Sequence, residues 1–481
     1  MYLMLADEPI MRIDFTQGIF DVLCPGKLPF PLRNVILPML GDDIQQYRYT
    51  FTQNYDAVME YLASRVLKLE RRNAKMILNS YNFSQSQDPY AKAEIAIACR
   101  AVSMIDSYWL NDDEMSLQWK DINVRKTPLD EVIAHIALTG SNLMVSNPPY
   151  TPELTGQGAY AKAWYREGDR NILYKASNQG GHEARIEESV SRILDCFGIE
   201  HVKYEISKFE NREITKCENM ASEELSIVPA QDFYIYCNRN NLDFLTEAMK
   251  IDKERLYQMC VVDYLISNSD RHSLNWGFYM NNATGNLVSI HPLYDHNNAF
   301  NERDMNDIDG GKSLIFPNKT KREMALHCIS ECNIKCIKSI KRDMFVKRSH
   351  YDSFMQRAAE LGLYEKKNRE IWNILNRTGL LKKEEMNMEG YDENTGLPMD
   401  KSYLECGLPE YLKKSVEQMI IAWEKKRNDP KYLSWDCVYC ELQSNINVAE
   451  VEQEITAEQA WHLREKYLHI RREDIFNSVT E

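Results

Sequence analysis

The sequence predicts an α+β fold in which a group of strands precedes a larger, mainly helical part. Four segments have the alternation or composition of strands: residues 159–165, 172–175, 204–209 and 213–220. Residues 183–197 carry one apolar stripe at helical spacing and end at Gly198, as helices often do. Residues 252–266 are apolar on most faces, which predicts a buried helix.

Three polar residues after this buried helix have the chemistry of a phosphoryl-transfer centre. That reaction needs a carboxylate to orient and deprotonate the attacking hydroxyl, and oxygen ligands to hold Mg²⁺ on the nucleotide phosphates. Asp270, Asn275 and Asp295 supply these groups in the order found in kinases. Any one of them alone is more typical of a turn or a helix cap. Their combined spacing favours a catalytic Asp270 and a metal site at Asn275 and Asp295.

The residues between Asn275 and Asp295 predict a β-hairpin that brings these two positions together. Residues 276–280 and 287–290 are strand-like, and the turn-rich residues 281–286 separate them. Paired strands lie roughly 5 Å apart, so the two ends of the hairpin can share one metal ion. We assign His272 to the same nucleotide site, where we expect it to orient the loop by hydrogen bonds.

A second candidate region lies upstream, in a loop that contains two glycines. Gly156 and Gly158 lack Cβ atoms, so a backbone that carries them can approach phosphate closely. Lys175 ends the second strand, where a cation can pair with the α and β phosphates, although strand lysines are more often exposed to solvent. The expected nucleotide contacts here are Thr155, Gly156, Gln157, Gly158, Ala159, Lys162 and Lys175.

An acidic residue should pair with the strand lysine, and a hinge should follow the last strand. Glu187 lies about twelve residues after Lys175, where kinases place this acid. Glu183 and Glu188 are close rivals, and a solvated helix face is the alternative role. Glu218 and Met220 lie where an adenine-binding hinge is expected, and backbone groups would make that contact.

The loop and metal-binding residues resemble those of HipA-like protein kinases. The resemblance extends upstream through Glu153 to Lys162, Tyr174-Lys175, and Glu187 to Ile199, and it covers roughly residues 144–380. It implies a two-lobed kinase fold with a small β-rich lobe and a large helical lobe. It also implies ATP with Mg²⁺, and transfer to a Ser or Thr hydroxyl of a protein.

Two departures from the family leave the substrate open. The loop Asp-Arg-His-x-x-Asn also resembles that of the phosphoinositide kinases, and the first 140 residues do not match the short amino-terminal subdomain of the best-known members. A lipid or small-molecule kinase with the same nucleotide site is therefore one alternative. A catalytically silent interaction module is another, although the intact Asp270, Asn275 and Asp295 argue against it.

The resemblance also implies a mode of regulation. HipA-like kinases carry an autophosphorylated Ser in the loop that aligns with Thr155, so a toxin-like enzyme that inhibits itself is expected, with an antitoxin or regulatory protein as its possible partner. Thr155 can equally be a turn-forming residue. An added phosphate, with a charge of about −1.5 to −2, would repel the ATP phosphates.

Composition and patterning predict a cytoplasmic protein of several domains. The net charge of −14 argues against nucleic acid and anionic membranes as partners. No basic leader is seen, and no apolar run reaches the roughly 18 residues of a membrane span. The expected domains are an amino-terminal, mostly helical domain that starts with short strands (1–143), a small lobe (144–222), a large lobe (223–428) and a helical appendage (429–481). Residues 44–138 should be largely helical, with a long helical segment over residues 56–79. Thr456 and Gln459 predict a capping box at the start of a short helix.

Overall fold

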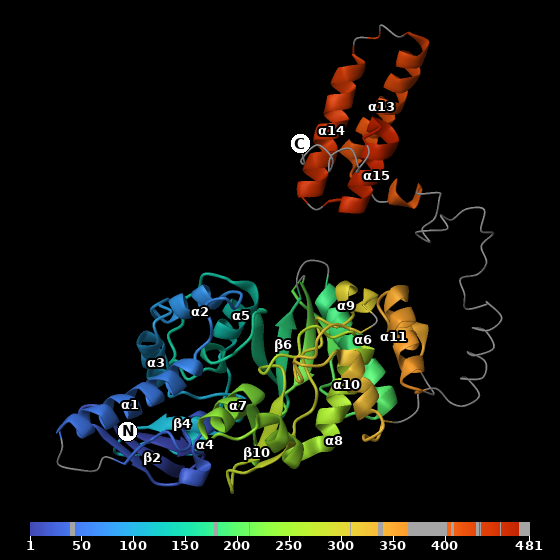
Figure 1. Cartoon of the computed structure of the whole chain (residues 1–481). Helices are drawn as coiled ribbons and strands as arrows, with labels where there is room; N and C mark the ends of the chain where they lie inside the picture. The colour runs from blue at the N-terminus through green and yellow to red at the C-terminus, as the bar shows by residue number, and fades with distance from the viewer. Residues whose placement is uncertain are drawn as a thin grey trace. The chain divides into compact units, whose positions relative to one another are not determined.

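The computed structural model describes residues 1–38, 44–177, 181–210, 212–307, 309–334, 340–363, 402–405, 408–429, 432, 434–452 and 454–470. It divides the chain into two compact units, Met1–Arg369 and Glu370–Glu481. The described residues form three small antiparallel sheets and many helices (Figure 1), in agreement with the predicted α+β class. The expected boundaries after residues 143 and 222 both fall within the first unit. None of the described helices is long and apolar enough to cross a membrane.

The first sheet contains four strands in the order β3-β2-β1-β4. Their bounds are Tyr2–Leu5 (β1), Glu8–Asp14 (β2), Ile19–Val22 (β3) and Tyr108–Asn111 (β4). We expected residues 44–138 to be largely helical, and β4 is the exception. It pairs with β1, and all four of its residues are buried, because Tyr108 and Leu110 pack into one apolar cluster and Trp109 into another. Residues 108–111 form a strand because they pair with β1, which lies more than a hundred residues earlier in the chain.

The helices of the amino-terminal region are shorter than their sequence pattern predicts. We expected one long helical segment over residues 56–79, but α1 (Ile44–Ser64) ends early and α2 (Ala74–Ser80) begins a turn or more later. The connector between them, residues 65–73, bonds instead to a distant loop: Leu67 N donates to Leu154 O over 2.8 Å. The other helices of this region are α3 (Pro89–Ala98), α4 (Trp119–Ile122) and α5 (Glu131–Thr139).

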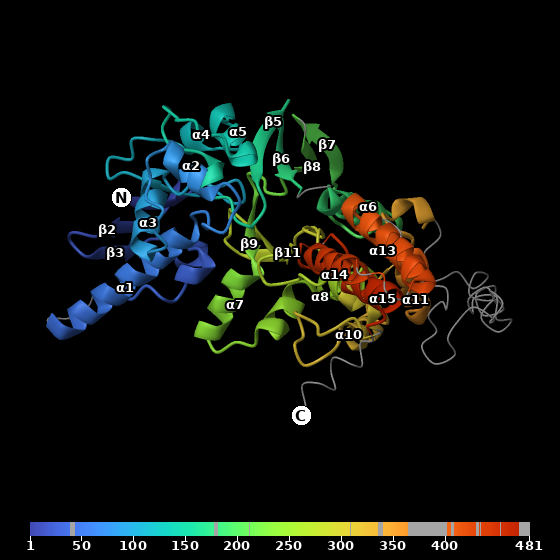
Figure 2. The same ribbon diagram turned by 90° about the horizontal axis from the view of Figure 1, so that it is seen from above.

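The second sheet is the predicted strand group, in the order β5-β6-β8-β7. Its strands are Lys162–Glu167 (β5), Arg170–Ala176 (β6), Glu205–Phe209 (β7) and Arg212–Glu218 (β8). Helix α6 (His182–Phe197) packs against β7 and β8, while α5 lies beside β5 (Figure 2). As predicted, the apolar stripe of α6 is buried, and Gly198 ends the helix with a left-handed φ of 65°.

The third sheet holds the predicted hairpin. Strands β10 (Gly277–Asn281) and β11 (Leu287–Ile290) pair antiparallel, and β9 (Leu225–Pro229) joins the other edge of β10. Helices α7 (Ala230–Arg239) and α8 (Phe244–Leu265) follow β9. The predicted helix start at Asp252 is a kink within α8, where Asp252 leaves helical geometry and its carboxylate accepts from Arg255 N over 3.1 Å. Asp252 thus caps the second half of α8.

The remaining elements complete the two units. After the hairpin come α9 (Glu302–Asn306), α10 (Lys321–Cys328) and α11 (Arg348–Glu360), all in the first unit. Short 3₁₀ helices span Pro25–Lys27, Phe30–Leu32, Pro152–Leu154, Arg342–Met344 and Ser402–Glu405.

The second unit contains α13 (Glu410–Asn428), α14 (Trp435–Val451) and α15 (Ala457–Leu468), which share an apolar core. Thr456 and Gln459 form the predicted capping box at the start of α15. The expected boundary after residue 428 separates α13 from α14, whereas the structure packs these two helices together.

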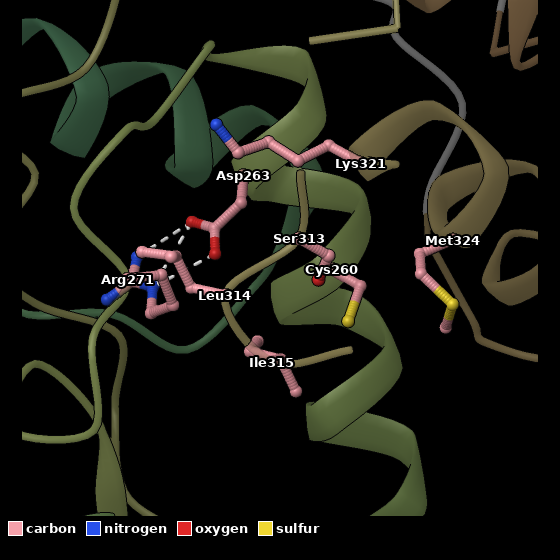
Figure 3. Close-up of a pocket in the computed structure, with 8 residues that line it drawn as sticks. All are labelled: Cys260, Asp263, Arg271, Ser313, Leu314, Ile315, Lys321 and Met324. Atoms are coloured by element: carbon pink, nitrogen blue, oxygen red, sulfur yellow. Dashed lines mark hydrogen bonds and ion pairs between the residues drawn. The ribbon is translucent and has the colours of Figure 1, made fainter. Parts of the chain in front are cut away.

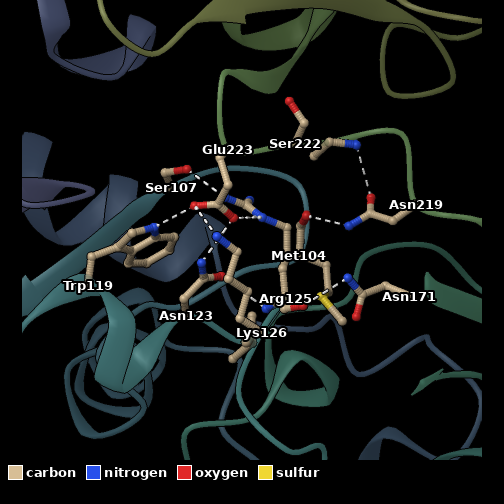
Figure 4. Close-up of polar contacts among 12 residues, drawn as sticks. Met104, Ser107, Trp119, Asn123, Arg125, Lys126, Asn171, Asn219, Ser222 and Glu223 are labelled. Carbon is tan, nitrogen blue, oxygen red and sulfur yellow. Dashed lines mark hydrogen bonds and ion pairs between the residues drawn. The ribbon is translucent and has the colours of Figure 1, made fainter. Parts of the chain in front are cut away.

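A polar network ties the amino-terminal region to the segment between β8 and β9 (Figure 4). The carboxylate of Glu223 accepts from Trp119 Nε1 and from Asn123 Nδ2, each over 3.0 Å. Asn219 Nδ2 donates to Met104 O over 2.9 Å. The segment expected to act as a hinge is therefore anchored to residues 104–125, so the amino-terminal region is built into the first unit.

Gly285 and Gly168 have similar backbone conformations but different surroundings, so substitutions at the two positions can test how closely the amino-terminal region packs on the hairpin. Gly285 in the hairpin turn has φ +74°, and a Cβ there would lie 2.2 Å from Gly26 O. Gly168 has a similar φ of +62°, but nothing lies within 4 Å of its Cβ position. We expect Gly168→Ala to lower the free energy of unfolding by about 1–2 kcal/mol through backbone strain alone. Gly285→Ala should cost a further ~1–3 kcal/mol through overpacking.

Urea unfolding of the two variants and their parent measures this difference. Equal losses in both variants would contradict the close approach of residues 26 and 285.

Candidate active site

A buried arginine organises the loop that follows α8. Arg271 is 2% exposed, and its Nε and Nη2 donate to the carboxylate of Asp263 on α8 over 3.0–3.2 Å. Its Nη1 donates to Asn275 O over 2.7 Å and to Tyr294 O over 3.0 Å. One guanidinium thus joins the helix, the predicted catalytic loop and the residue just before Asp295. The hairpin ends meet here, as the sequence predicts.

A small cavity lies beside this ion pair, with a volume of about 10 Å³. Figure 3 shows its lining between α8, α10 and residues 313–315, with Asp263 and Arg271 at one side. Such a volume holds about one water molecule. The cavity is therefore a packing defect behind the loop, and it is too small to receive a nucleotide.

The carboxylate of Asp270 is held by two asparagine amides. Asn298 Nδ2 donates to Asp270 Oδ2 over 2.9 Å, and Asn275 Nδ2 lies 3.4 Å from the same oxygen while it donates to the backbone carbonyl of Asp270 over 2.9 Å. Asn298 was not singled out in the sequence, because an Asn in a polar loop gives no distinguishing signal. The amide nitrogen of Asn275 is occupied by this contact, which leaves its carbonyl oxygen for a ligand.

His272 lies next to Asp270 but is half-exposed. Its Nε2 lies 3.6 Å from Asp270 Oδ1, and its Nδ1 accepts from Leu274 N over 3.2 Å. These contacts fit the expected loop-orienting role. Its assignment to nucleotide binding stays a prediction.

Lys175 lies between two carboxylates. Its Nζ is 2.6 Å from Glu187 Oε1 and 2.5 Å from Asp295 Oδ1. Thr215 Oγ1 donates to the second oxygen of Glu187 over 3.0 Å, which fixes that carboxylate from the sheet side. The rival acids are engaged elsewhere: Glu183 accepts from Ser177 Oγ, and Glu188 faces Arg192. The structure thus pairs Glu187 with Lys175.

The charges of this cluster reinforce one another. Burial acts to lower the pKa of Lys175, but Asp295 and Glu187 outweigh it and raise that pKa well above the ordinary lysine value. Burial acts to raise the pKa of Asp295, and the adjacent Lys175 overcomes it and lowers the value to about 2. Lys175 is therefore an ammonium and Asp295 a carboxylate at neutral pH.

Asp295 also has an unusual backbone conformation, with φ +56°. Its N–H donates to Tyr204 Oη over 3.2 Å. Asp tolerates the left-handed region better than most residues, and such strain is found often at functional sites.

The predicted phosphate loop contacts the amino-terminal region more than the sequence suggested. Gln157 Nε2 donates to Ser64 O and Val66 O, each over 3.1 Å. Thr155 is buried, and its hydroxyl donates to Pro152 O over 3.2 Å, which matches the turn-forming alternative. Ala159 O accepts from Arg72 N over 2.8 Å.

Arg71 is the residue of this region that sequence reasoning missed. It is 3% exposed, and its guanidinium donates to Glu153 O, Gly156 O and Lys162 O over 2.7–3.0 Å. The periodicity of residues 56–79 placed it in a helix, so no signal in the sequence connected it with the loop.

Two lysines stand opposite each other on the sheet beside this loop. Lys162 on β5 and Lys175 on β6 are register partners. Burial, then the charges of Arg71 and Lys175, lower the pKa of Lys162 to about 7. The ring of Tyr160 lies 5.0 Å from Lys175 Nζ.

The two predicted hinge residues lie in different environments. Glu218 ends β8 with an exposed side chain, 4.0 Å from Arg170. Met220 O accepts from Tyr279 Oη over 3.2 Å. The N–H of Met220 donates to no group in the described part of the chain, so it is available to a ligand.

Comparisons with known proteins found distant structural likenesses. No family model matches the sequence, and no curated protein matches it. A structure of HipA with HipB and operator DNA, a toxin–antitoxin system of Shewanella oneidensis MR-1, matches at 14% identity and a TM-score of 0.42, covering 76% of this chain and 97% of that one. The Helicobacter pylori proinflammatory kinase CtkA matches at 14% identity and a TM-score of 0.30, covering 42% and 89%. Likenesses of this strength assign neither fold nor function to this chain.

The Asp263–Arg271 pair should be essential to stability. Arg271→Met leaves the carboxylate of Asp263 buried without its partner, and breaking a buried pair in this way costs about 3–5 kcal/mol. Urea unfolding should show a loss of this size, and the double variant Asp263→Leu/Arg271→Met should recover part of it. A single variant as stable as the parent would contradict the role given to this pair.

Proposed function

We propose that the protein is an ATP- and Mg²⁺-dependent phosphotransferase of the HipA-like kinase type, which transfers the γ-phosphoryl group to a Ser or Thr hydroxyl of a protein. One observation carries the proposal. Lys175 lies between Glu187 and Asp295, and Arg271 holds the loop of Asp270 and Asn275 to the residue before Asp295. In this proposal residues 144–222 form the small lobe, and the large lobe begins at residue 223.

Asp270 is the proposed base. Its carboxylate would accept the proton of the acceptor hydroxyl as the hydroxyl oxygen forms a bond to the γ-phosphorus, while the bond from that phosphorus to the bridging oxygen of ADP breaks. The amides of Asn298 and Asn275 hold Asp270 in one orientation. Its carboxylate is partly exposed, which leaves an approach for the acceptor.

The donor set at the hairpin ends suits Mg²⁺. The Asp295 carboxylate and the Asn275 carbonyl oxygen are hard oxygen ligands, and Mg²⁺ in such sites takes one or two protein oxygens together with phosphates and water. When bound, the ion would neutralise charge on the β and γ phosphates. The low pKa of Asp295, about 2, keeps this ligand ionised at any physiological pH.

Lys175 would exchange one of its partners when ATP binds. In this structure its ammonium contacts Glu187 and Asp295. An ammonium has three donors, so Lys175 can keep Glu187 and turn toward the α and β phosphates. Gly156 to Ala159 would cover the phosphates, and the free N–H of Met220 would donate a hydrogen bond to the adenine.

Acceptor and regulation remain expectations from the resemblance. A lipid or small-molecule acceptor would use the same nucleotide site, and an antitoxin or other regulatory protein is the expected partner. Autophosphorylation at Thr155 would require the loop to open, because that hydroxyl is buried and bonded to Pro152 O. A cytoplasmic location, without nucleic acid or membrane partners, is the remaining expectation.

A labelled-ATP assay with the purified protein tests the proposed function. Incubation with and without Mg²⁺, with protein, inositol-lipid and small-molecule acceptors in separate reactions, should give Mg²⁺-dependent label on protein. If label appears only on a lipid or a small molecule, the acceptor is of that class and the protein is not a protein kinase. Absence of both ATP binding and transfer would refute the proposal.

Removal of the proposed base should reduce transfer without loss of nucleotide binding. We expect Asp270→Asn to lower the transfer rate about 10²–10⁴-fold, the usual weight of a positioned proton acceptor. Its ATP affinity, measured by calorimetry, should stay near that of the parent. Asp169→Asn, in the exposed turn between β5 and β6, is the matched control and should be fully active. Parent-like transfer by Asp270→Asn would show that the base is another group.

Binding of ATP should also take up a proton at Lys162. With a pKa of about 7, this amine is mostly neutral at pH 8 in the free protein, and phosphates placed beside it would raise its pKa. At pH 6 the amine is already charged and contributes no uptake. Calorimetry in two buffers of different ionisation enthalpy measures the proton, and Lys162→Met should abolish the uptake at pH 8. An unchanged uptake in that variant would remove Lys162 from the nucleotide site.

A further inference from the structure

The connector between α1 and α2, residues 65–73, donates hydrogen bonds to carbonyl oxygens of the glycine-containing loop. Leu67 N donates to Leu154 O, and Arg72 N donates to Ala159 O, each over 2.8 Å. From the loop side, Gln157 Nε2 donates to the carbonyls of Ser64 and Val66. The loop therefore lies against the amino-terminal region along most of its length.

Arg71 makes the densest of these contacts. Its Nη1 donates to Glu153 O over 2.9 Å and to Gly156 O over 3.0 Å, while Nη2 donates to Lys162 O over 2.7 Å. A Cβ on Gly156 would lie 2.6 Å from Arg71 Nη1. A side chain at position 156 would therefore displace this guanidinium.

The N–H groups of the same loop have no such partners. From Gly156 to Ala161, no backbone N–H donates a hydrogen bond to any group in the described part of the chain. Neighbouring carbonyls at Glu153, Leu154, Gly156, Ala159 and Lys162 all accept one from the connector. The connector thus holds several carbonyls of this segment, whereas the N–H groups of residues 156–161 stay free. Consecutive free N–H groups form a site for an anion.

Arg71 carries a cost that stability alone does not explain. Its side chain is buried, and within the described ranges its guanidinium donates to carbonyl oxygens. Burial lowers the pKa of Arg71 to about 10, and the charge of the nearby Glu153 offsets only part of that effect. A buried charge that is not in direct contact with a carboxylate costs free energy. Carbonyl oxygens offset only part of this, and an apolar residue would fill the same space without that cost. What the three hydrogen bonds of Arg71 achieve, and an apolar residue would not, is to fix the orientation of the glycine-containing loop.

We propose that Arg71 is a positioning residue for phosphate: by holding the carbonyls of Glu153, Gly156 and Lys162, it leaves the N–H groups of residues 156–161 directed to the nucleotide. This inference rests on the proposed function, because the anion in question is the phosphate chain of ATP. It makes residues 65–73 of the amino-terminal region a part of the nucleotide site. Released carbonyls could otherwise turn toward the phosphates and repel them.

Comparison of ATP with adenosine separates positioning from general structure. Arg71→Met keeps the length of the side chain and removes its donors. We expect its affinity for Mg²⁺-ATP to fall about tenfold to a hundredfold, the weight of one or two hydrogen bonds to a charged acceptor. Adenosine lacks phosphate, so its affinity should be unchanged. Both are measured by calorimetry on the full-length chain.

Arg166→Met is the matched control. Arg166 also donates to three carbonyls, those of Val124, Arg125 and Thr127, and it lies in the same sheet without contact to the glycine loop. It should bind ATP and adenosine like the parent. Should Arg71→Met fail to fold, Gln157→Ala breaks the loop–connector contact from the loop side, and it should show the same selective loss for ATP.

Each outcome decides between the two claims. If the parent binds ATP and the Arg71→Met variant binds it with equal affinity, the positioning role is overturned. The proposed function is left standing in that case. Parallel losses for ATP and adenosine overturn it too, because they would show that Arg71 supports the whole lobe. A parent that binds no ATP refutes the proposed function itself.

Discussion

The contact between Arg271 and Asp263 is the constraint on which the candidate site depends. A loop that follows a helix has no ladder to satisfy its backbone, so side chains must supply its partners. Arg271 does this for Asn275 O and Tyr294 O while its charge is balanced by Asp263. Asn268 Nδ2 also donates to Asp263 over 2.9 Å, which fixes that carboxylate. The hairpin ends therefore meet at one guanidinium.

The same device recurs in the first unit. Arg357 is buried and donates to Tyr264 O over 2.7 Å and to Asp307 O over 3.1 Å, so it anchors the segment after α9 to α8. Arg71 does so for the glycine-containing loop. A planar guanidinium has five donors in a fixed fork, against three on a lysine ammonium, so it can serve several carbonyls at once. Irregular segments around the site are thus held by arginines in place of secondary structure.

The sequence predicted correctly those elements whose partners lie close by in the chain. The hairpin, the β5–β6 pair and helix α6 depend on neighbours within about twenty residues, and their spacing is visible in the chain. Strand β4 and the connector at residues 65–73 depend on partners far away, so helical periodicity misled us there. For the same reason Lys175 and Glu187 could be paired from the sequence, whereas Asn298 and Arg71 could not.

The two opposed lysines give a physical reason to expect an anion between the strands and the loop. Like charges directly opposite each other on a sheet are destabilising, and Lys162 and Lys175 are register partners. Glu187 and Asp295 already balance Lys175, but no acidic group in the described residues forms an ion pair with Lys162. Burial, together with the charges of Arg71 and Lys175, lowers its pKa to about 7. A phosphate beside the free N–H groups would supply the missing charge, so the sheet should be more stable with nucleotide than without it.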